Sequence, residues 1–311
     1  MIYENILEAI GNTPLVRLQR IVPEGAAEIL VKYEGIGVGG SIKTRTALAM
    51  LRAAAREGKI KEDSIIVEAT SGNQGIGLAL AGAVLGYRTV IVMPDSVSEE
   101  RRLLVRQYGA EVRLVHDAGD IGRAIRECQE TADAMAAADP RVFIPAQFDN
   151  PENPRIHETT TAREILRDAG GPLDGFCSGI GTGGTLTGIG RVLKEANPET
   201  LVVAIEPEEA AILSGGTIGT HLQMGIGDGI VPPILDASVI DEIAIVTDEE
   251  ALETARRLAR EEGLLTGISG GSNVAVALRL AKRLGAGKRV VTVLPDTGER
   301  YFSTPLFEEC R

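Results

Sequence analysis

The sequence contains only three cysteines and three histidines among its 311 residues. The cysteines are odd in number and far apart, which does not make a disulfide framework and favours a reducing compartment, the cytoplasm; they are Cys128, Cys177 and Cys310. The histidines form no His-x-x-x-His pattern and accompany no Cys-x-x-Cys pattern, so we expect no metal site; they are His116, His157 and His221.

Long apolar runs and an excess of positive charge are missing as well. Every apolar stretch is too short to span a bilayer. Glu4 and Glu8 interrupt the N-terminal residues, where a signal peptide would have a basic segment followed by an apolar run. The formal net charge of -12 repels phosphodiester backbones and anionic lipids, so we expect neither a nucleic acid nor a membrane as partner.

Hydrophobic residues make up 44% of the chain, enough for a sizeable core, and strand-like and helix-like segments alternate along it. A buried strand is predicted at 64–68, and further strands are expected at 88–93 and 111–115. Continuous apolar runs bounded by turn residues predict parallel strands covered on both faces at 201–205 and 289–294. Helices are expected at 75–85, 99–108, 120–138 and from 247 to about 262. This alternation predicts an α/β fold with parallel sheets. The proline-rich segment 145–154 marks the favoured domain boundary.

A glycine- and threonine-rich segment, GIGTGGT at residues 179–185, lies between an apolar strand-like run and a helix-like run. Glycines let backbone N–H groups approach a phosphate closely, and the positive end of the following helix favours an anion. A tight structural turn is the alternative, but it does not need so many glycines and hydroxyls together. The segment therefore predicts a phosphate site.

The same segment also matches the dinucleotide fingerprint G-x-G-x-x-G. Gly179, Gly181 and Gly184 take the glycine positions, and Glu206 follows 22 residues after the last of them. An acidic residue near that spacing often binds a ribose. An NAD-dependent oxidoreductase is thus a rival hypothesis, although one fingerprint is weak evidence.

Two further segments carry chemically suggestive groups. Lys43 follows glycines 39 and 40 just before a helix-like run, where the positive helix end lowers the pKa of a lysine and frees it to attack a carbonyl. A solvated surface lysine is the alternative. Residues 70–75, TSGNQG, join a strand to a helix and offer hydroxyls and N–H groups suited to a carboxylate, where simple helix capping would need one such residue.

These segments belong to a series of seven motifs in one order: IGNTPLVRL at 10–18, GGSIKTR at 39–45, TSGNQG at 70–75, PAQFDNPENP at 145–154, GTGGT at 181–185, GISGGSN at 267–273 and LPDTGERYFST at 294–304. Together they resemble the cysteine synthase branch of the fold type II enzymes that use pyridoxal 5'-phosphate (PLP). The resemblance covers essentially the whole chain.

The resemblance implies two doubly wound α/β domains with the PLP cleft between them. It places residues 1–40 as an N-terminal segment packed with the large domain. Residues 41–148 would be a smaller, mobile α/β domain, and residues 149–311 the larger, PLP-binding domain. It also implies a homodimer, by analogy alone.

The resemblance assigns roles to individual residues. Lys43 would bind PLP covalently and move the proton at Cα, and Asn73 would contact the 3′ oxygen of the cofactor. The phosphate would lie on Gly181, Thr182, Gly183, Gly184 and Thr185. Ser269 would meet the ring nitrogen. The substrate carboxylate would lie on Thr70, Ser71, Gly72, Asn73 and Gln147.

The sequence departs from the family pattern near the expected site. Gly37 and Val38 replace Asn-Pro, and Gly270 replaces a serine. Thr44 stands where an aspartate usually follows the lysine, and Gln74 stands where threonine is usual. Asp228, in MGIGDG, replaces a small apolar residue. It either reflects neutral drift or acts on the β-substituent or the incoming nucleophile, as carboxylates near a reacting centre can.

The leading functional hypothesis is cysteine synthesis from O-acetyl-L-serine and sulfide. The closest alternative keeps the chemistry and uses L-cysteine as the donor. Sulfide would then leave, and serine, lanthionine, cystathionine or diaminopropionate would be the product. The more distant hypotheses are the NAD-dependent oxidoreductase and a catalytically silent binding module.

Overall fold

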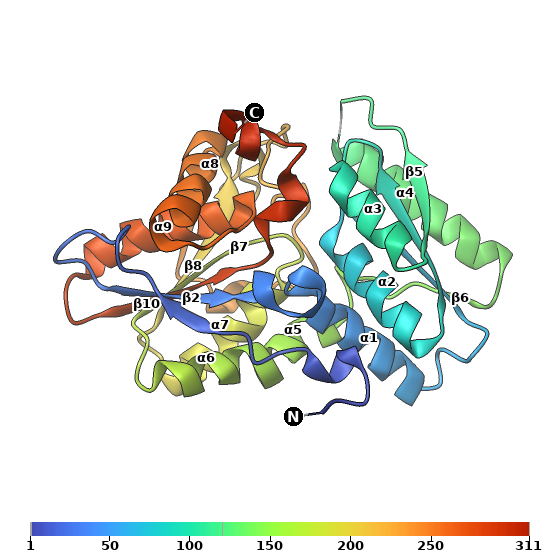
Figure 1. Ribbon diagram of the computed structural model, residues 1–311, viewed down its shortest axis with the longest axis horizontal. Coiled ribbons are helices and arrows are strands. Elements are labelled where there is room, and N and C mark those ends of the chain that lie inside the picture. Colours follow the sequence, from blue (N-terminus) through green and yellow to red (C-terminus); the bar gives the residue numbers. More distant parts are fainter. Residues whose placement is uncertain (1, 120, 311) are drawn as a thin grey trace.

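The computed structural model describes residues 2–119 and 121–310 and contains two β-sheets flanked by helices (Figure 1). The larger sheet has the order β1-β2-β10-β7-β8-β9. Its strands are β1 (Leu15–Arg17), β2 (Glu28–Tyr33), β7 (Gly175–Gly179), β8 (Leu201–Pro207), β9 (Glu242–Val246) and β10 (Arg289–Leu294). All of its pairings are parallel except that of the edge strand β1 with β2.

The smaller sheet is entirely parallel and has the order β5-β4-β3-β6. Its strands are β3 (Ile65–Ala69), β4 (Arg88–Pro94), β5 (Glu111–Val115) and β6 (Val142–Phe143).

Helices cover both faces of both sheets. They are α1 (Lys43–Arg56), α2 (Asn73–Leu85), α3 (Glu99–Gln107), α4 (Ile121–Ala138), α5 (Glu152–Ile156), α6 (Ala162–Ala169), α7 (Gly184–Ala196), α8 (Asp248–Arg257) and α9 (Ile268–Leu284). Single π-helical turns continue α5 at His157–Thr161 and α8 at Leu258–Glu262. Short 3-10 turns occur at Ile6–Ala9, Glu34–Ile36, Val38–Gly40, Glu208–Ala210, Ala237–Val239, Gly298–Tyr301 and Pro305–Cys310.

The apolar runs of the sequence become the cores between these layers. On the larger sheet, one core lies beneath α8 and α9 and the other beneath α6 and α7 (Figure 1). On the smaller sheet, side chains of α1, α2 and α3 pack on one face and α4 packs on the other. Strands buried on both faces cannot alternate polar and apolar residues, which explains their continuous apolar sequences. The expected α/β fold with parallel sheets is confirmed.

Each sheet contains a place where the direction of winding reverses. From β7 the chain proceeds outward through β8 to β9, whereas β10 lies on the other side of β7. From β3 it proceeds through β4 to β5, whereas β6 lies on the other side of β3. Loops leaving two neighbouring strands in opposite directions open a crevice at their carboxyl ends, which is where ligands bind in such sheets.

The structure differs from the sequence-based expectations in several strands and at the start of α1. The strands β1, β2, β6 and β9 were not among the expected strands, and β1 runs antiparallel to β2. Helix α1 begins at Lys43, so this lysine belongs to the helix and does not precede it. Residue 120 of the helix expected at 120–138 lies outside the described residues. The division into domains at 1–40, 41–148 and 149–311 stays a prediction.

Within residues 2–119 and 121–310, no helix combines the length and the apolar character needed to cross a bilayer.

Candidate active site

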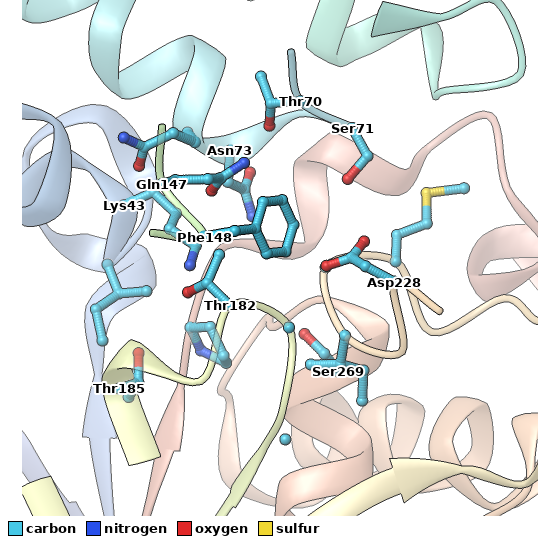
Figure 2. A pocket seen from close by; sticks show the side chains of 18 of the residues that line it. Lys43, Thr70, Ser71, Asn73, Gln147, Phe148, Thr182, Thr185, Asp228 and Ser269 are labelled. Atoms are coloured by element: carbon cyan, nitrogen blue, oxygen red, sulfur yellow. The ribbon is translucent and has the colours of Figure 1, made fainter. Parts of the chain in front are cut away.

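A cavity with about 900 Å³ of empty space, its mouth included, lies at the carboxyl ends of strands from both sheets. Side chains from α1, the loop after β3, the loop after β6, the loop after β7 and the start of α9 line it (Figure 2). The sequence-predicted residues among the lining are Lys43, Thr70, Ser71, Asn73, Gln147, Gly181, Thr182, Gly183, Thr185, Asp228 and Ser269. Gly72 and Gly184 belong to the same loops without lining the cavity. The fold thus brings together segments more than 200 residues apart.

Four helices present their first turn to the cavity. Its lining includes the first residue of α1 and of α2, Lys43 and Asn73, and the second residue of α7 and of α9, Thr185 and Ser269. The N-terminus of a helix carries partial positive charge and free N–H groups. This convergence favours an anionic ligand such as a phosphate or a carboxylate.

The amine of Lys43 lies in this cavity and makes no hydrogen bond to any described residue. Burial lowers the pKa of Lys43, and the nearby Asp228 carboxylate opposes that shift. The sequence-based expectation named the positive helix end as the cause of a lowered Lys43 pKa. In the structure the main cause is the loss of water around the buried amine. A lysine with a lowered pKa has more of the neutral form that attacks a carbonyl or accepts a proton.

The glycines of the loop after β7 have no room for a side chain. A Cβ on Gly181 would lie 2.4 Å from the backbone oxygen of Gly225, and one on Gly184 would lie 2.1 Å from Oδ1 of Asn153. Gly183, which precedes α7, has a φ of +79°, in the left-handed region that favours glycine. The loop therefore exposes its backbone to the cavity at the start of a helix, which fits a phosphate group.

His157 supports this loop from behind and was not singled out by the sequence argument. It is fully buried, and its ring nitrogens lie 3.0 Å from Oγ1 of Thr161 and 3.4 Å from Oγ1 of Thr185. Burial, together with the positive charges of Lys43 and Arg45, holds the pKa of His157 well below its usual range. The ring is therefore neutral. Nothing in its sequence context distinguishes it from the other two histidines.

The start of α2 is tied to the segment after β10. Asn73 donates from Nδ2 to Asp296 at 2.7 Å and accepts at Oδ1 from Arg300 at 2.5 Å. The second hydrogen of the Asn73 amide remains available to a ligand. Arg101 of α3 also lines the cavity and donates to the hydroxyl of Tyr301 at 2.8 Å. Sequence reasoning missed Arg101, since a single arginine in a charged helix looks like a surface residue.

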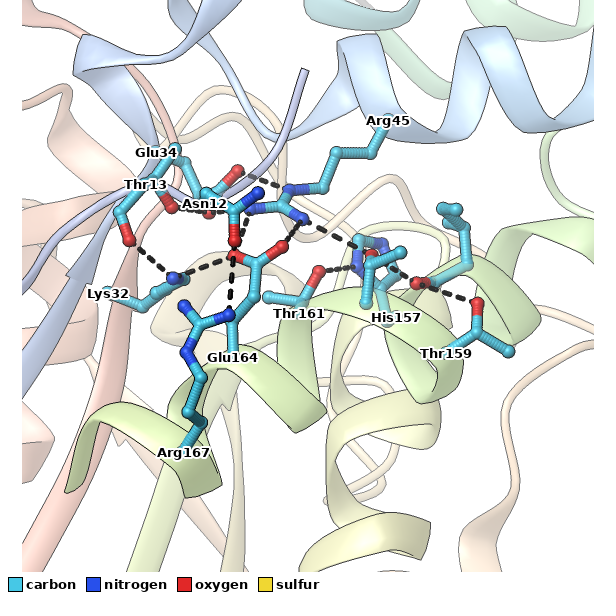
Figure 3. Close-up of polar contacts among 12 residues, drawn as sticks. Asn12, Thr13, Lys32, Glu34, Arg45, His157, Thr159, Thr161, Glu164 and Arg167 are labelled. Atoms are coloured by element: carbon cyan, nitrogen blue, oxygen red, sulfur yellow. Dashed lines mark hydrogen bonds and ion pairs between the residues drawn. The ribbon is translucent and has the colours of Figure 1, made fainter. Parts of the chain in front are cut away.

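A buried charge network fixes the start of α1 (Figure 3). Arg45 donates to Glu34 at 2.8 Å and to Glu164 at 2.7 Å, and Lys32 lies 2.8 Å from Glu164. Burial opposes ionisation of Glu164, but the bonds from Arg45 hold its pKa at about 2. Removing one member of such a network costs about 3–5 kcal/mol, because a buried charge is left unpaired. The network therefore holds Lys43 in place through its helix.

Asp228 faces the cavity from the loop that follows Met224 (Figure 2). Burial raises the pKa of Asp228, while the charge of Lys43 is the main influence that opposes that shift. His221 is 3.1 Å from the backbone oxygen of Gly227 and so holds the loop. A carboxylate with a raised pKa close to a reactive amine has the properties of a general base.

Glu206, the acid of the dinucleotide hypothesis, is used within the chain. Its carboxylate accepts the backbone N–H groups of Leu213 at 2.7 Å and Ser214 at 3.1 Å, as well as the Ser214 hydroxyl at 2.9 Å. It is 5% exposed, so a ribose would have to displace these bonds. No group of three or more potential metal-ligating side chains was found in the described part of the chain.

These features fit a phosphate-bearing aldehyde cofactor. The cavity offers a buried amine for the aldehyde and a buried serine hydroxyl, that of Ser269, for a ring nitrogen. For the phosphate it offers a loop whose glycines have no space for a Cβ.

Comparison with known proteins agrees with this assignment. Residues 6–296 match the model of a family described as pyridoxal-phosphate dependent enzyme. A cysteine synthase of Staphylococcus aureus (strain Mu50 / ATCC 700699) is 48% identical over 305 residues, covering 98% of this chain and 97% of the relative.

Two solved structures share the fold closely. The O-ureido-L-serine-bound K43A mutant of O-ureido-L-serine synthase has a TM-score of 0.95 and 46% identity, with 100% of this chain and 95% of that chain covered. A hydrogen sulfide-producing enzyme from Fusobacterium nucleatum has a TM-score of 0.91 and 41% identity, with 96% and 100% covered. With the match over nearly its whole length, the chain belongs to the family of pyridoxal-phosphate dependent enzymes.

Proposed function

We propose that this enzyme catalyses β-replacement on an L-amino acid, making L-cysteine and acetate from O-acetyl-L-serine and sulfide. The observation that carries the proposal is the meeting of a buried amine, a glycine loop suited to phosphate and a polar loop suited to a carboxylate in one cavity. The 48% identity to a cysteine synthase supports the choice of substrates.

The proposed cofactor contacts follow the lining of the cavity. Lys43 would hold PLP covalently, Gly181, Thr182, Gly183, Gly184 and Thr185 would hold its phosphate, Asn73 its 3′ oxygen and Ser269 its ring nitrogen. When bound, PLP supplies an electron sink that makes the Cα proton of the amino acid acidic and lets the β-substituent leave.

The chain itself supplies proton transfer, orientation and exclusion of water. The Lys43 amine takes the proton from Cα and later returns it. The carboxylate of the amino acid lies on Thr70, Ser71, Gly72, Asn73 and Gln147. Phe148, whose ring stands among these groups in Figure 2, covers the reacting atoms with an apolar surface.

A second candidate function is favoured by Asp228. In it, L-cysteine is the donor, sulfide leaves, and water, a thiol or an amine adds at Cβ. A carboxylate in the cavity repels the hydrosulfide anion, which disfavours sulfide as the nucleophile. It also accepts a proton from a neutral nucleophile during attack. The similar hydrogen sulfide-producing enzyme supports this candidate.

The two functions are separated by measuring both donors with the wild type and an Asp228→Ala variant. If cysteine synthesis is the function, O-acetylserine with sulfide should far outpace sulfide release from L-cysteine, and the substitution should change little. If Asp228 is the base, sulfide release should lose roughly 100-fold or more in rate. The absorbance change of the cofactor on adding the donor should then persist. Asp63→Ala removes an exposed carboxylate and serves as control.

We further propose that the enzyme is a homodimer, by analogy with the family. Light scattering of the holoenzyme at working concentration should give twice the 32.9 kDa mass of one chain. A mass of one chain would refute the dimer.

A cytoplasmic location is also proposed. Cys128 and Cys177 are buried and unpaired, and burial raises the pKa of each thiol to about 12, so both are unreactive. Buried unpaired thiols are typical of a reducing compartment. The side chain of Cys310 lies outside the described part of the structure.

A further inference from the structure

Glu68 is a buried carboxylate that does not line the active-site cavity. It lies near the end of β3, is 2% exposed, and is followed by Ala69 and Thr70, which do line the cavity. Its two oxygens accept the backbone N–H groups of Ala146 and Gln147, each at 2.9 Å. Glu68 therefore ties the end of one strand to the loop that follows the neighbouring strand β6.

That loop contains an unfavourable backbone conformation. Ala146 has a φ of +55°, and among the described residues the other non-glycine residue with positive φ is Asn12. Alanine has no polar side chain to stabilise the left-handed region, so the surroundings must hold it there. The two bonds to Glu68, and a bond of 2.8 Å from Asn150 Nδ2 to the oxygen of Pro145, do so.

The conformation of Ala146 determines where the next side chains point. Gln147 and Phe148 follow it directly, and both line the active-site cavity. The backbone oxygen of Gln147 accepts from Asn153 at 2.8 Å, and the same amide group donates to Thr182 of the glycine loop at 2.9 Å. Contacts thus run continuously from Glu68, through the loop, to the predicted phosphate site.

We propose that Glu68 is a positioning residue whose ionised carboxylate holds the left-handed turn at Ala146 and thereby aims Gln147 at the carboxylate of the amino-acid substrate. This rests on the proposed function, which gives Gln147 that role. Glu68 itself touches neither substrate nor cofactor.

The environment of Glu68 makes this positioning sensitive to pH. Burial raises the pKa of Glu68 to about 7, the N–H groups of Gln147 and Ala146 oppose the shift, and the charge of Asp149 adds to it. Glu68 lines a second cavity, separate from the active-site cavity. Asp149 and Asp133 of α4 also line this second cavity, and no Lys, Arg or His of the described chain does. A protonated carboxyl places an O–H donor among N–H donors and loses an acceptor.

Binding and folding then respond to pH in opposite directions. Positioning requires the ionised form, so substrate binding should weaken as pH falls through about 7. Since the pKa of Glu68 is higher in the folded than in the unfolded chain, the folded state favours the protonated form. The contribution of Glu68 to stability is therefore full at acid pH and is lost as pH rises from 4.5 to about 7.

The test compares wild-type holoenzyme with Glu68→Gln, which keeps the shape of the side chain but replaces one acceptor oxygen by an NH2 donor group at every pH. The dissociation constant of the donor amino acid is followed by cofactor absorbance from pH 6 to 8.5. At pH 8 the variant should bind about tenfold more weakly, as expected for one lost hydrogen bond, and the ratio of variant to wild type should shrink toward pH 6. The turnover number at saturation should change much less than KM.

Hydrogen exchange gives a readout that does not depend on substrate. The amides of residues 146 and 147 should exchange faster in Glu68→Gln at pH 8, and in the wild type their protection should fall below pH 7. Asp149→Asn removes an exposed acid that acts on Glu68 and should shift the midpoint of both effects to lower pH. Glu62→Gln, an exposed change before β3, should leave both unchanged.

The outcomes separate this inference from the proposed function. Wild-type affinity and wild-type protection in Glu68→Gln would overturn the inference, and so would weaker binding without faster exchange at residues 146 and 147. If no β-substituted amino acid changes the absorbance of the wild-type cofactor, the proposed function fails. The exchange experiment then still decides whether Glu68 holds the turn.

Discussion

Replacing Lys43 by alanine is expected to lower the turnover number by about a thousandfold or more and to abolish covalent attachment of the cofactor. The reason is geometric. Within the described cavity Lys43 supplies the only lysine amine, and the other cationic side chain lining it, Arg101, stays protonated and cannot act as a base or nucleophile. The glycine loop is untouched by the change, so the variant should still bind PLP through its phosphate.

The measurement combines turnover with chemical trapping. Borohydride treatment of the wild type should fix the cofactor on the peptide that contains Lys43, whereas the Lys43→Ala variant should carry none. Lys59→Ala, with a side chain 62% exposed on the surface, is the matched control and should behave like the wild type. A colourless wild type that binds a nicotinamide nucleotide, or a Lys43→Ala variant labelled elsewhere with turnover intact, would contradict the assignment.

Replacing Gly181 by valine should weaken PLP binding by about 10- to 100-fold, since displacing a backbone costs about 1–3 kcal/mol. The added Cβ would lie 2.4 Å from the oxygen of Gly225, which is backbone and cannot rotate away, and 3.3 Å from the carboxylate of Asp228. Either the glycine loop or the loop bearing Asp228 must therefore move. Gly183→Val should act similarly, because its φ of +79° strains a β-branched residue and its Cβ would lie 3.0 Å from Leu235.

Cofactor affinity is measured by titrating the apoenzyme and following absorbance. Gly190→Ala, farther along α7, is the control because its Cβ would lie 3.2 Å from Cγ2 of Val239, which need shift by only a few tenths of an ångström, and it meets no atom of the loops that line the cavity. Thermal melting of each apoenzyme shows whether the variants fold. Unchanged cofactor occupancy in both loop variants would mean that the phosphate lies elsewhere.

The strands that could be predicted from the sequence are those in which nearly all residues are apolar and buried in the core. The runs that became β3, β4, β8 and β10 are largely apolar on both faces, a pattern typical of strands covered by helices on both sides. The strand β2 was missed although four of its residues are buried. Its pattern is broken by Lys32, which is polar but fully buried against Glu164. A buried ion pair is invisible in a sequence because its partner lies on a distant helix.

The glycine loop and Lys43 could be singled out from the sequence because the proposed chemistry requires particular residues at adjacent positions. The roles of Glu68 and His157 were not predictable, since each depends on contacts with residues far away in the chain. Glu68 accepts hydrogen bonds from backbone N–H groups 78 and 79 residues later. Such partners cannot be recognised from the pattern of side chains in a sequence. The pKa shift of Lys43 was expected in direction, but its main cause, burial, depends on how two sheets enclose it.

The sequence by itself determined the fold class and the family, and it singled out the residues proposed to meet a phosphate and a carboxylate, because these depend on local periodicity and on short motifs. Only the tertiary structure decided which side chains share one cavity, which acids are buried and which turn is strained. Asp228 shows the difference: in the sequence it is a single substitution in a glycine-rich loop. In the structure it is a carboxylate with a raised pKa in the same cavity as the amine of Lys43, because the ends of separate strands and helices converge there.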